Sequence, residues 1–166
     1  MRNHAATHIR VVVADDHPSI RENLRYLLNA EADMRVVGVA SDGAEALTVA
    51  SDALPDVLVL DHDMPGLDGL AVMRRLRTDH PGIAVVMYTA QPEMCDDAMN
   101  AGAAGCVGKD ESPALLLDTI RNAAAGLALG DLRRNAAGAL PHIEPLEVAA
   151  LARAIEAGQI EAYLQP

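Results

Sequence analysis

Five polar residues stand at the carboxyl ends of short apolar segments of the sequence: Asp15, Asp16, Asp61, Thr89 and Lys109. Carboxylates gathered in one crevice repel one another, by roughly 4 kcal/mol for two charges about 4 Å apart at an effective dielectric constant near 20. A hard divalent cation offsets this repulsion, and Mg²⁺ prefers oxygen ligands while keeping space for phosphate oxygens. The residue set therefore predicts a Mg²⁺ site to which Lys109 adds one further positive charge.

A carboxylate beside a divalent cation and a lysine is equipped for phosphoryl transfer. In such a site Asp61 attacks phosphorus and forms an aspartyl phosphate. The cation and Lys109 hold the phosphoryl oxygens as negative charge develops. The Thr89 hydroxyl can hydrogen-bond a phosphoryl oxygen only when the phosphoryl is present, so Thr89 is a candidate switch. Any one of these residues could instead be a helix cap or a solvated loop charge, and it is their common placement that indicates a site.

Alternating strand-type and helix-type segments must position these side chains. Strands are predicted over residues 9–14, 35–40, 56–60, 83–88 and 105–108. Helices are predicted over residues 18–28, 42–50, 67–77, 92–101 and 113–126, with Gly126 as terminator. Because strands that are apolar throughout are buried on both faces, we expect an α/β fold, a doubly wound five-stranded parallel sheet with helices on both faces. In such sheets ligands bind outside the carboxyl ends of the strands.

The composition excludes several classes of protein. The 166 residues include 13 Lys and Arg against 24 Asp and Glu, a net charge of −11. This balance argues against direct nucleic-acid contact, which needs clustered basic residues. No apolar run is long enough to span a bilayer and no secretion signal is present, so we expect a cytoplasmic protein without membrane contact. Phe and Trp are absent, so we expect a core of Leu, Val, Ile, Met and Ala. Cys95 and Cys106 show no disulfide or metal pattern, and we interpret both as small buried thiols.

Four motifs together resemble one known family. They are Asp15-Asp16-His17-Pro18, the segment 61–69 (DHDMPGLDG), Thr89-Ala90 and Gly108-Lys109-Asp110. In order and spacing they are similar to the receiver domain of bacterial response regulators, over residues 9–126. The resemblance implies a flavodoxin-like sheet with strand order 2-1-3-4-5. It implies that a sensor histidine kinase or phosphotransfer protein supplies the phosphate.

The resemblance also assigns roles within the site. It implies Asp61 as the phospho-acceptor, with Asp16 and Asp61 as direct Mg²⁺ ligands. The backbone carbonyl of Asp63 would be a third ligand, and Asp15 would act through water. Thr89 and Lys109 take the switch and phosphate-pairing roles.

One residue departs from the family pattern. Three residues before the lysine the family usually has a Tyr or Phe that moves inward on activation, and this chain has Cys106 there. A thiol cannot fill or vacate a pocket of that size. We therefore hypothesise that Thr89 and the loop 90–93 carry the signal mainly through backbone movement.

The C-terminal region follows a different pattern. Residues 1–8 form a tail, 9–126 the receiver, and 127–144, with Gly130, Gly138 and Pro141, a linker. Residues 145–166 are expected to hold a helix and a first strand, and residues 151–166 (LARAIEAGQIEAYLQP) resemble the start of EAL-type cyclic di-GMP phosphodiesterase domains. This resemblance implies a truncated output domain in cis, and a chain that is not itself an enzyme apart from its own phosphorylation and dephosphorylation.

Two other functions remain open at this point. Asp61 and Asp63 after an apolar strand also suit a haloacid-dehalogenase-like phosphatase, with Asp61 as nucleophile and Asp63 as acid. In that family, however, the acidic metal pair follows the lysine, whereas Asp15 and Asp16 come first here. A stand-alone receiver that acts through protein–protein interaction is the other alternative, and homodimerisation stays open.

Overall fold

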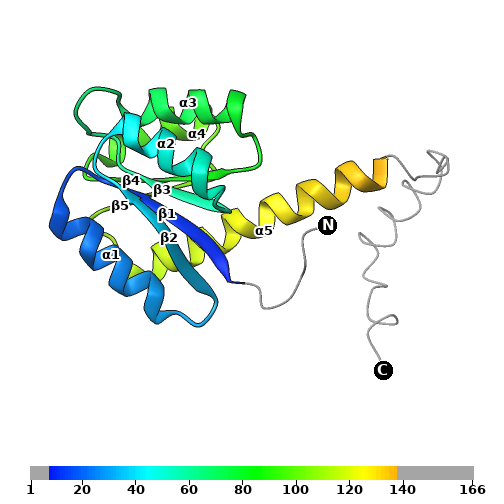
Figure 1. Ribbon diagram of the computed structural model, residues 1–166, viewed down its shortest axis with the longest axis horizontal. Coiled ribbons are helices and arrows are strands. Elements are labelled where there is room, and N and C mark those ends of the chain that lie inside the picture. Colours follow the sequence, from blue (N-terminus) through cyan, green and yellow to red (C-terminus); the bar gives the residue numbers. More distant parts are fainter. Residues whose placement is uncertain (1–7, 138–166) are drawn as a thin grey trace, which may run out of the picture. The chain divides into compact units, whose positions relative to one another are not determined.

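Strands and helices alternate along the chain in the computed structural model, which describes residues 8–137 (Figure 1). The elements are β1 (Ile9–Ala14), α1 (Pro18–Ala30), β2 (Met34–Ala40), α2 (Gly43–Ala53), β3 (Val57–Leu60), α3 (Gly69–Asp79), β4 (Ala84–Thr89), the short 3-10 helix η1 (Pro92–Met94), α4 (Cys95–Asn100), β5 (Gly105–Gly108) and α5 (Pro113–Ala137). All pairings are parallel, in the order β2-β1-β3-β4-β5. The predicted five-stranded, doubly wound sheet is confirmed.

Local sequence signals set where the helices begin. The Asp42 side chain accepts a hydrogen bond from the Glu45 backbone N–H at 2.8 Å, and Asp68 does the same for Ala71 at the start of α3. Such caps satisfy backbone donors that have no partner within the helix. The loop between β3 and α3 turns at Gly66, whose φ of 79° is one that glycine adopts readily. These signals fix the loops that lead away from the strand ends.

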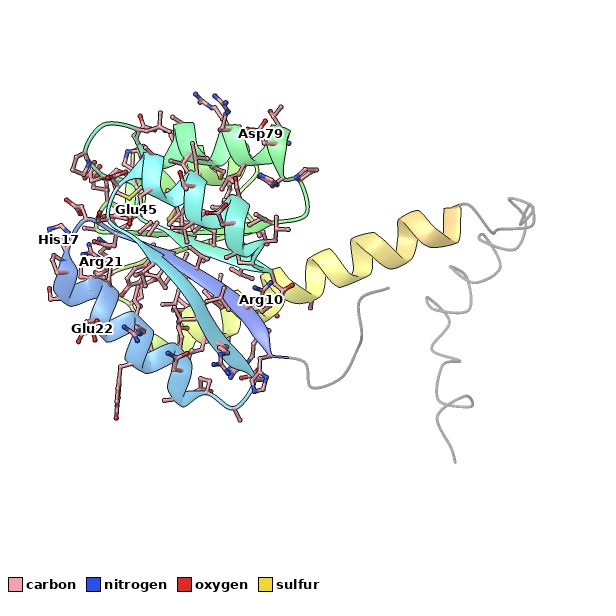
Figure 2. The ribbon with its side chains drawn as sticks, viewed as in Figure 1. Arg10, His17, Arg21, Glu22, Glu45 and Asp79 are labelled. Atoms are coloured by element: carbon pink, nitrogen blue, oxygen red, sulfur yellow. A yellow bond between two sulfur atoms is a disulfide. The ribbon has the colours of Figure 1, made fainter. Side chains whose placement is uncertain are left out.

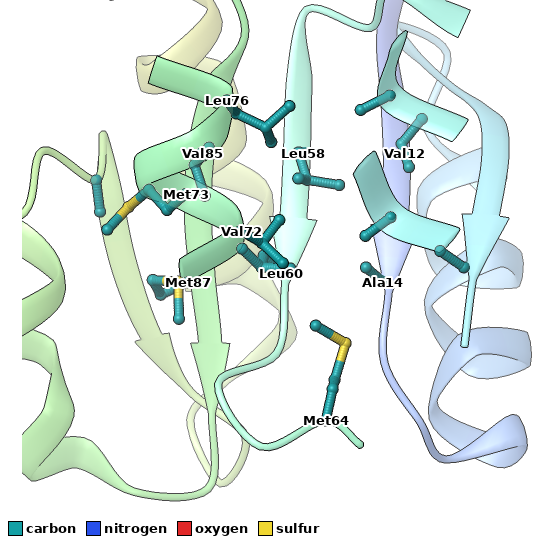
Figure 3. Packing of buried hydrophobic residues seen from close by; sticks show 14 of the residues in the cluster. Val12, Ala14, Leu58, Leu60, Met64, Val72, Met73, Leu76, Val85 and Met87 are labelled. Carbon is teal, nitrogen blue, oxygen red and sulfur yellow. The ribbon is translucent and has the colours of Figure 1, made fainter. Parts of the chain in front are cut away.

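Side chains alternate between two apolar layers, one on each face of the sheet. Val12, Leu58 and Met87 point to the layer under α2, α3 and α4, part of which Figure 3 shows. Val11 and Val86 point to the layer under α1 and α5. The fully buried side chains of both layers are Leu, Val, Ile, Met and Ala, as the scarcity of aromatic residues predicts. Close packing of these strands fixes the backbone positions of the polar residues at their carboxyl ends.

The C-terminal boundary differs from the prediction. The helix expected to end at Gly126 continues to Ala137, so residues 127–137 of the predicted linker are helical. One glycine costs a helix only about 1 kcal/mol, and the leucines and alanines that follow favour helix. The chain divides into two units, Met1–Gly130 and Asp131–Pro166, and the predicted helix and strand within 145–166 lie outside the described residues. Within residues 8–137 no helix is long and apolar enough to cross a membrane.

Candidate functional site

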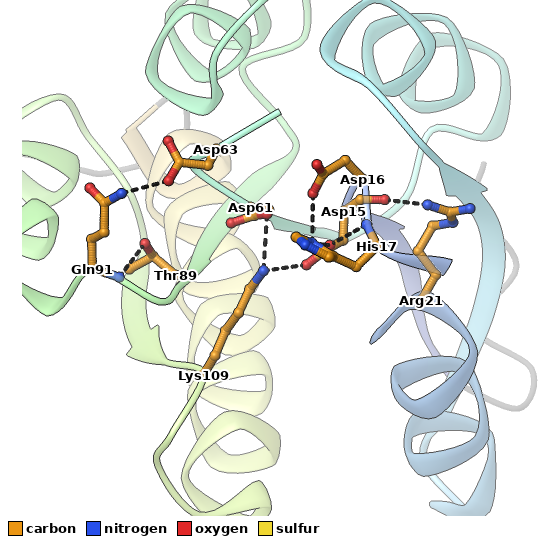
Figure 4. A network of polar contacts seen from close by, with 9 residues as sticks. All are labelled: Asp15, Asp16, His17, Arg21, Asp61, Asp63, Thr89, Gln91 and Lys109. Carbon is orange, nitrogen blue, oxygen red and sulfur yellow. Dashed lines mark hydrogen bonds and ion pairs between the residues drawn. The ribbon is translucent and has the colours of Figure 1, made fainter. Parts of the chain in front are cut away.

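Asp15, Asp61 and Lys109 meet at the carboxyl ends of three strands (Figure 4). The Lys109 Nζ atom lies 2.6 Å from Asp15 Oδ2 and 3.0 Å from Asp61 Oδ2. The two carboxylate side chains are only 1% and 3% exposed, and the lysine side chain is 14% exposed. One ammonium therefore serves two buried carboxylates, an arrangement that leaves a net negative charge in the crevice.

The β1–α1 loop supplies the rest of the acidic cluster. His17 Nδ1 lies 2.8 Å from Asp16 Oδ1 and 3.1 Å from Asp15 Oδ1, and the His17 backbone N–H donates to Asp15 Oδ1. Arg21, one turn into α1, donates from Nη1 to the Asp15 carbonyl oxygen at 2.6 Å. Figure 2 shows His17 and Arg21 together near the start of α1. The loop is thus fixed both through its backbone and through its carboxylates.

Burial and charge shift the protonation of the two central groups. Burial raises the pKa of the Asp61 carboxyl above its usual value; the Lys109 ammonium opposes this effect, and the Asp15 carboxylate adds to it. Burial by itself would lower the pKa of Lys109, but its contacts with Asp15 and Asp61 outweigh burial and raise that pKa overall. Lys109 therefore stays charged, and Asp61 gives up its proton less readily than an exposed aspartate.

The donor set fits a hard divalent cation. Asp15, Asp16, His17 and Asp61 each offer a ligand atom within 4.8 Å of the others. Within the described residues, Asp15 Oδ2 and Asp61 Oδ2 are buried with the Lys109 ammonium as their cationic neighbour. Three carboxylates lie in this cluster, and the two buried ones share a single lysine, so the donor set matches the preference of Mg²⁺ for oxygen. The role of the Asp63 backbone carbonyl as a further ligand stays a prediction.

Thr89 and Asp63 are connected on the other side of the crevice by a residue that the sequence did not single out. The Thr89 side chain is buried, and its Oγ1 accepts the Gln91 backbone N–H at 3.0 Å. The Gln91 side-chain amide donates to Asp63 Oδ2. Gln91 thereby bridges the loop after β3 and the loop after β4. The Thr89 hydroxyl retains its own proton as a donor, which is the group that the switch role needs.

The interpretation of the cysteines as free buried thiols is wrong. Cys95 and Cys106 form a disulfide, with their Cα atoms 5.5 Å apart. Both residues are half-buried. Neither the spacing nor the composition indicates this pair, because it depends on the placement of the first residue of α4 over β5.

The structure thus brings together most of the predicted residues. Asp15, Asp16, Asp61 and Lys109 form one contiguous cluster, whereas Thr89 and Asp63 border it through Gln91. His17 stands at the position before α1 with a side chain that is 60% exposed. Arg21, Gln91 and the disulfide are the additions, and no sequence motif indicates any of them.

Comparison with known proteins finds relatives of this chain in sequence and in fold. The family model of the response regulator receiver domain matches residues 11–121. The transcriptional regulatory protein YxjL of Bacillus subtilis is 38% identical over 123 residues, 73% of this chain and 56% of that protein. The transcriptional regulatory protein NarL of Mycobacterium tuberculosis is 33% identical over 183 aligned residues, 100% of this chain and 85% of that protein. The solved signal receiver domain of NarL has a TM-score of 0.68 at 37% identity, covering 72% of this chain and 98% of that chain.

These relatives bear on the predicted output. Both curated relatives carry the names of transcriptional regulators, and neither is named a cyclic di-GMP phosphodiesterase. The comparisons therefore do not support an EAL-type output. The residues that suggested it, 151–166, lie outside the described part of the chain.

Proposed function

The chain belongs to the response regulator receiver domains, and from this premise we propose that it accepts a phosphoryl group on Asp61 and passes the signal to an output. The observation that carries the proposal is the ion-paired cluster in which Lys109 contacts both Asp15 and Asp61. Family membership leaves the haloacid-dehalogenase-like phosphatase without support. The acidic pair also precedes the lysine here, which is the reverse of the order in that family.

The residues divide the chemistry between them. The Asp61 carboxylate attacks the phosphorus of a phosphohistidine on a sensor kinase or phosphotransfer protein, the P–N bond breaks, and the imidazole leaves. Lys109 pairs with a phosphoryl oxygen, and the Thr89 hydroxyl donates to another. Asp15, Asp16 and Asp61 would hold Mg²⁺, which when bound neutralises charge on the transferring phosphoryl group. The family motifs and the distances within the cluster support this assignment of roles.

Thr89 connects the phosphorylation site with the surface. When Thr89 donates to a phosphoryl oxygen, the hydrogen bond from the Gln91 N–H and the contact of Gln91 with Asp63 must adjust. The loop that follows β4 therefore moves with the state of Asp61. This agrees with the hypothesis that backbone movement carries the signal where the usual aromatic residue is Cys106.

Binding of beryllofluoride, a stable mimic of the phosphoryl group, tests the proposal. Wild-type protein should bind it only with Mg²⁺ present and should show shifted amide resonances around Thr89 and Gln91. Asp61→Asn should lose the response, while Asp52→Asn, a change in an exposed aspartate of α2, should keep it. A wild-type protein that does not respond removes the proposal.

The output is a separate part of the proposal. Residues 151–166 resemble the start of an EAL domain, which favours regulated hydrolysis of cyclic di-GMP in a longer protein. The names of the relatives favour transcriptional regulation instead. If the output is transcriptional regulation, the predicted lack of nucleic-acid contact applies to the receiver only. A cellular protein heavier than 17.5 kDa whose cyclic di-GMP hydrolysis changes on phosphorylation supports the first output. Phosphorylation-dependent DNA binding supports the second, and a chain that ends at Pro166 supports a stand-alone receiver.

A further inference from the structure

A disulfide joins α4 to the sheet next to the proposed phosphorylation site. Cys95 is the first residue of α4, and Cys106 lies on β5, three residues before Lys109. Cys106 pairs in register with Met87 of β4, which lies two residues before Thr89. The bond thus connects α4, the helix after the Thr89 loop, to β5. Lys109 directly follows β5, and Thr89 ends the neighbouring strand β4.

Packing alone holds α4 weakly. Only Ala98 of its six residues is buried, and Met99 is 49% exposed. An alanine buries little apolar surface, so this helix gains little from the hydrophobic effect. The covalent bond from Cys95 to Cys106 is therefore an important addition to the packing of Ala98, and it fixes the first residue of α4 to the sheet.

The same bond restricts the loop that must move. Residues 90–94 connect Thr89, the last residue of β4, to Cys95. With the disulfide closed, both ends of this five-residue segment are fixed to neighbouring strands of one sheet. With the disulfide open, the α4 end is held by the packing of Ala98 rather than by a covalent bond, and the segment can follow Thr89 and Gln91 more freely.

We propose that Cys95 and Cys106 are a redox modification site, which couples α4 to the phosphorylation site in the dithiol form and uncouples it in the disulfide form. Both residues are half-buried, so small oxidants reach them. Glu93, Asp96 and Asp97 lie within two residues of Cys95 in the sequence and are exposed, and their negative charge favours a neutral oxidant such as hydrogen peroxide over an anionic disulfide. Disulfides that form in reducing compartments are commonly transient and redox-sensing.

The oxidation balances with peroxide as the only co-reactant. One thiolate attacks an oxygen of hydrogen peroxide, the O–O bond breaks, and a sulfenic acid forms as the first water is released. The second thiolate attacks the sulfur of the sulfenic acid, the S–O bond breaks, and the second water is released. Two thiols are oxidised to one disulfide while one peroxide is reduced to two waters. A dithiol reductant reverses the change by thiol–disulfide exchange.

The test compares the full chain after treatment with dithiothreitol and after treatment with hydrogen peroxide, each reagent being removed before measurement. The oxidised protein should be lighter by two hydrogen atoms and should resist alkylation at both cysteines. Amides of α4 should exchange with solvent at least about tenfold faster in the dithiol form, within the typical range of disulfide stabilisation. Beryllofluoride with Mg²⁺ should bind the dithiol form at least about fivefold more tightly, the low end of typical coupling between sites.

Two variants separate this proposal from the proposed function on which its coupling part rests. Cys95→Ala/Cys106→Ala should behave like the dithiol form after either treatment. Asp61→Asn should lose beryllofluoride binding yet keep the redox difference in α4 exchange. If both thiols remain alkylatable after peroxide, or if both redox forms bind beryllofluoride equally and exchange α4 amides equally, the redox proposal is overturned. If neither form of the wild type binds beryllofluoride, the proposed function fails instead.

Discussion

Replacement of Lys109 by methionine should destabilise the cation-free protein. Methionine keeps the length of the side chain but removes the ammonium that lies 2.6 Å from Asp15 Oδ2 and 3.0 Å from Asp61 Oδ2. Both carboxylates are almost fully buried, so water cannot replace the lost contact. Removing one partner of a buried ion pair costs about 3–5 kcal/mol in typical cases.

The expected magnitude lies at the lower end of that range. Asp61 already has a raised pKa, so part of the cost is avoided when its carboxyl takes up a proton. We therefore expect a loss of about 3 kcal/mol in the free energy of unfolding at neutral pH. In a domain of this size this corresponds to a melting temperature lower by roughly 10 °C. Saturating Mg²⁺ should reduce the difference, since the cation supplies positive charge to the same oxygens.

Urea unfolding in a chelating buffer measures the effect, and Arg75→Met is the matched control. Arg75 pairs with Asp79 at 2.9 Å, but both side chains are well exposed, so its loss should cost less than about 1 kcal/mol. If Lys109→Met and Arg75→Met unfold at the same urea concentration, the claim that Lys109 offsets two buried carboxylates is wrong.

Three further predictions follow from the same contacts. Because the pKa of Asp61 is raised, Mg²⁺ affinity should fall as the pH is lowered through that pKa, beginning above the ordinary aspartate value of about 3.9. The same shift should make the cation-free wild type lose stability relative to Asp61→Asn as the pH rises through this range. Calorimetric titrations that show no change of Mg²⁺ affinity or stability with pH would count against the raised pKa. Gly69→Ala should cost about 1–3 kcal/mol and weaken Mg²⁺ binding, because its Cβ would clash with the Asp61 carbonyl oxygen, whereas Gly82→Ala, with open space around it, should change stability little; equal urea midpoints would refute this. Cys106→Tyr should respond to beryllofluoride no more strongly than Cys106→Ala, as judged by amide shifts in α4; a much larger response would show that an aromatic residue can restore the family's usual switch.

The sheet was predictable because a parallel strand that is buried on both faces is a short run of apolar residues. Val57 to Leu60 are all buried, so the segment contains no polar residue until Asp61, and the end of the strand and the position of the site coincide. The same logic places Lys109 after β5. Predicted strand ends differ from the observed ones by a single residue at most, because one polar or glycine residue marks each of them.

The misjudged features depend on tertiary contacts or on weak local signals. Gly126 does not end α5, since a single glycine is too small a penalty against the helix-favouring residues beyond it. Cys95 and Cys106 become partners only because α4 begins over β5. Gln91 connects Thr89 to Asp63 because the loop after β4 lies beside the loop after β3, and nothing in the local sequence indicates this contact.

Phosphoryl transfer from acetyl phosphate tests the central claim most directly. Wild-type protein with Mg²⁺ should gain the mass of one phosphoryl group, the label should be lost in hydroxylamine as expected of an acyl phosphate, and peptide mapping should place it on Asp61. Asp61→Asn, and wild type in a chelating buffer, should remain unlabelled. Labelling that persists in Asp61→Asn, or a wild type that never becomes labelled, would contradict the account.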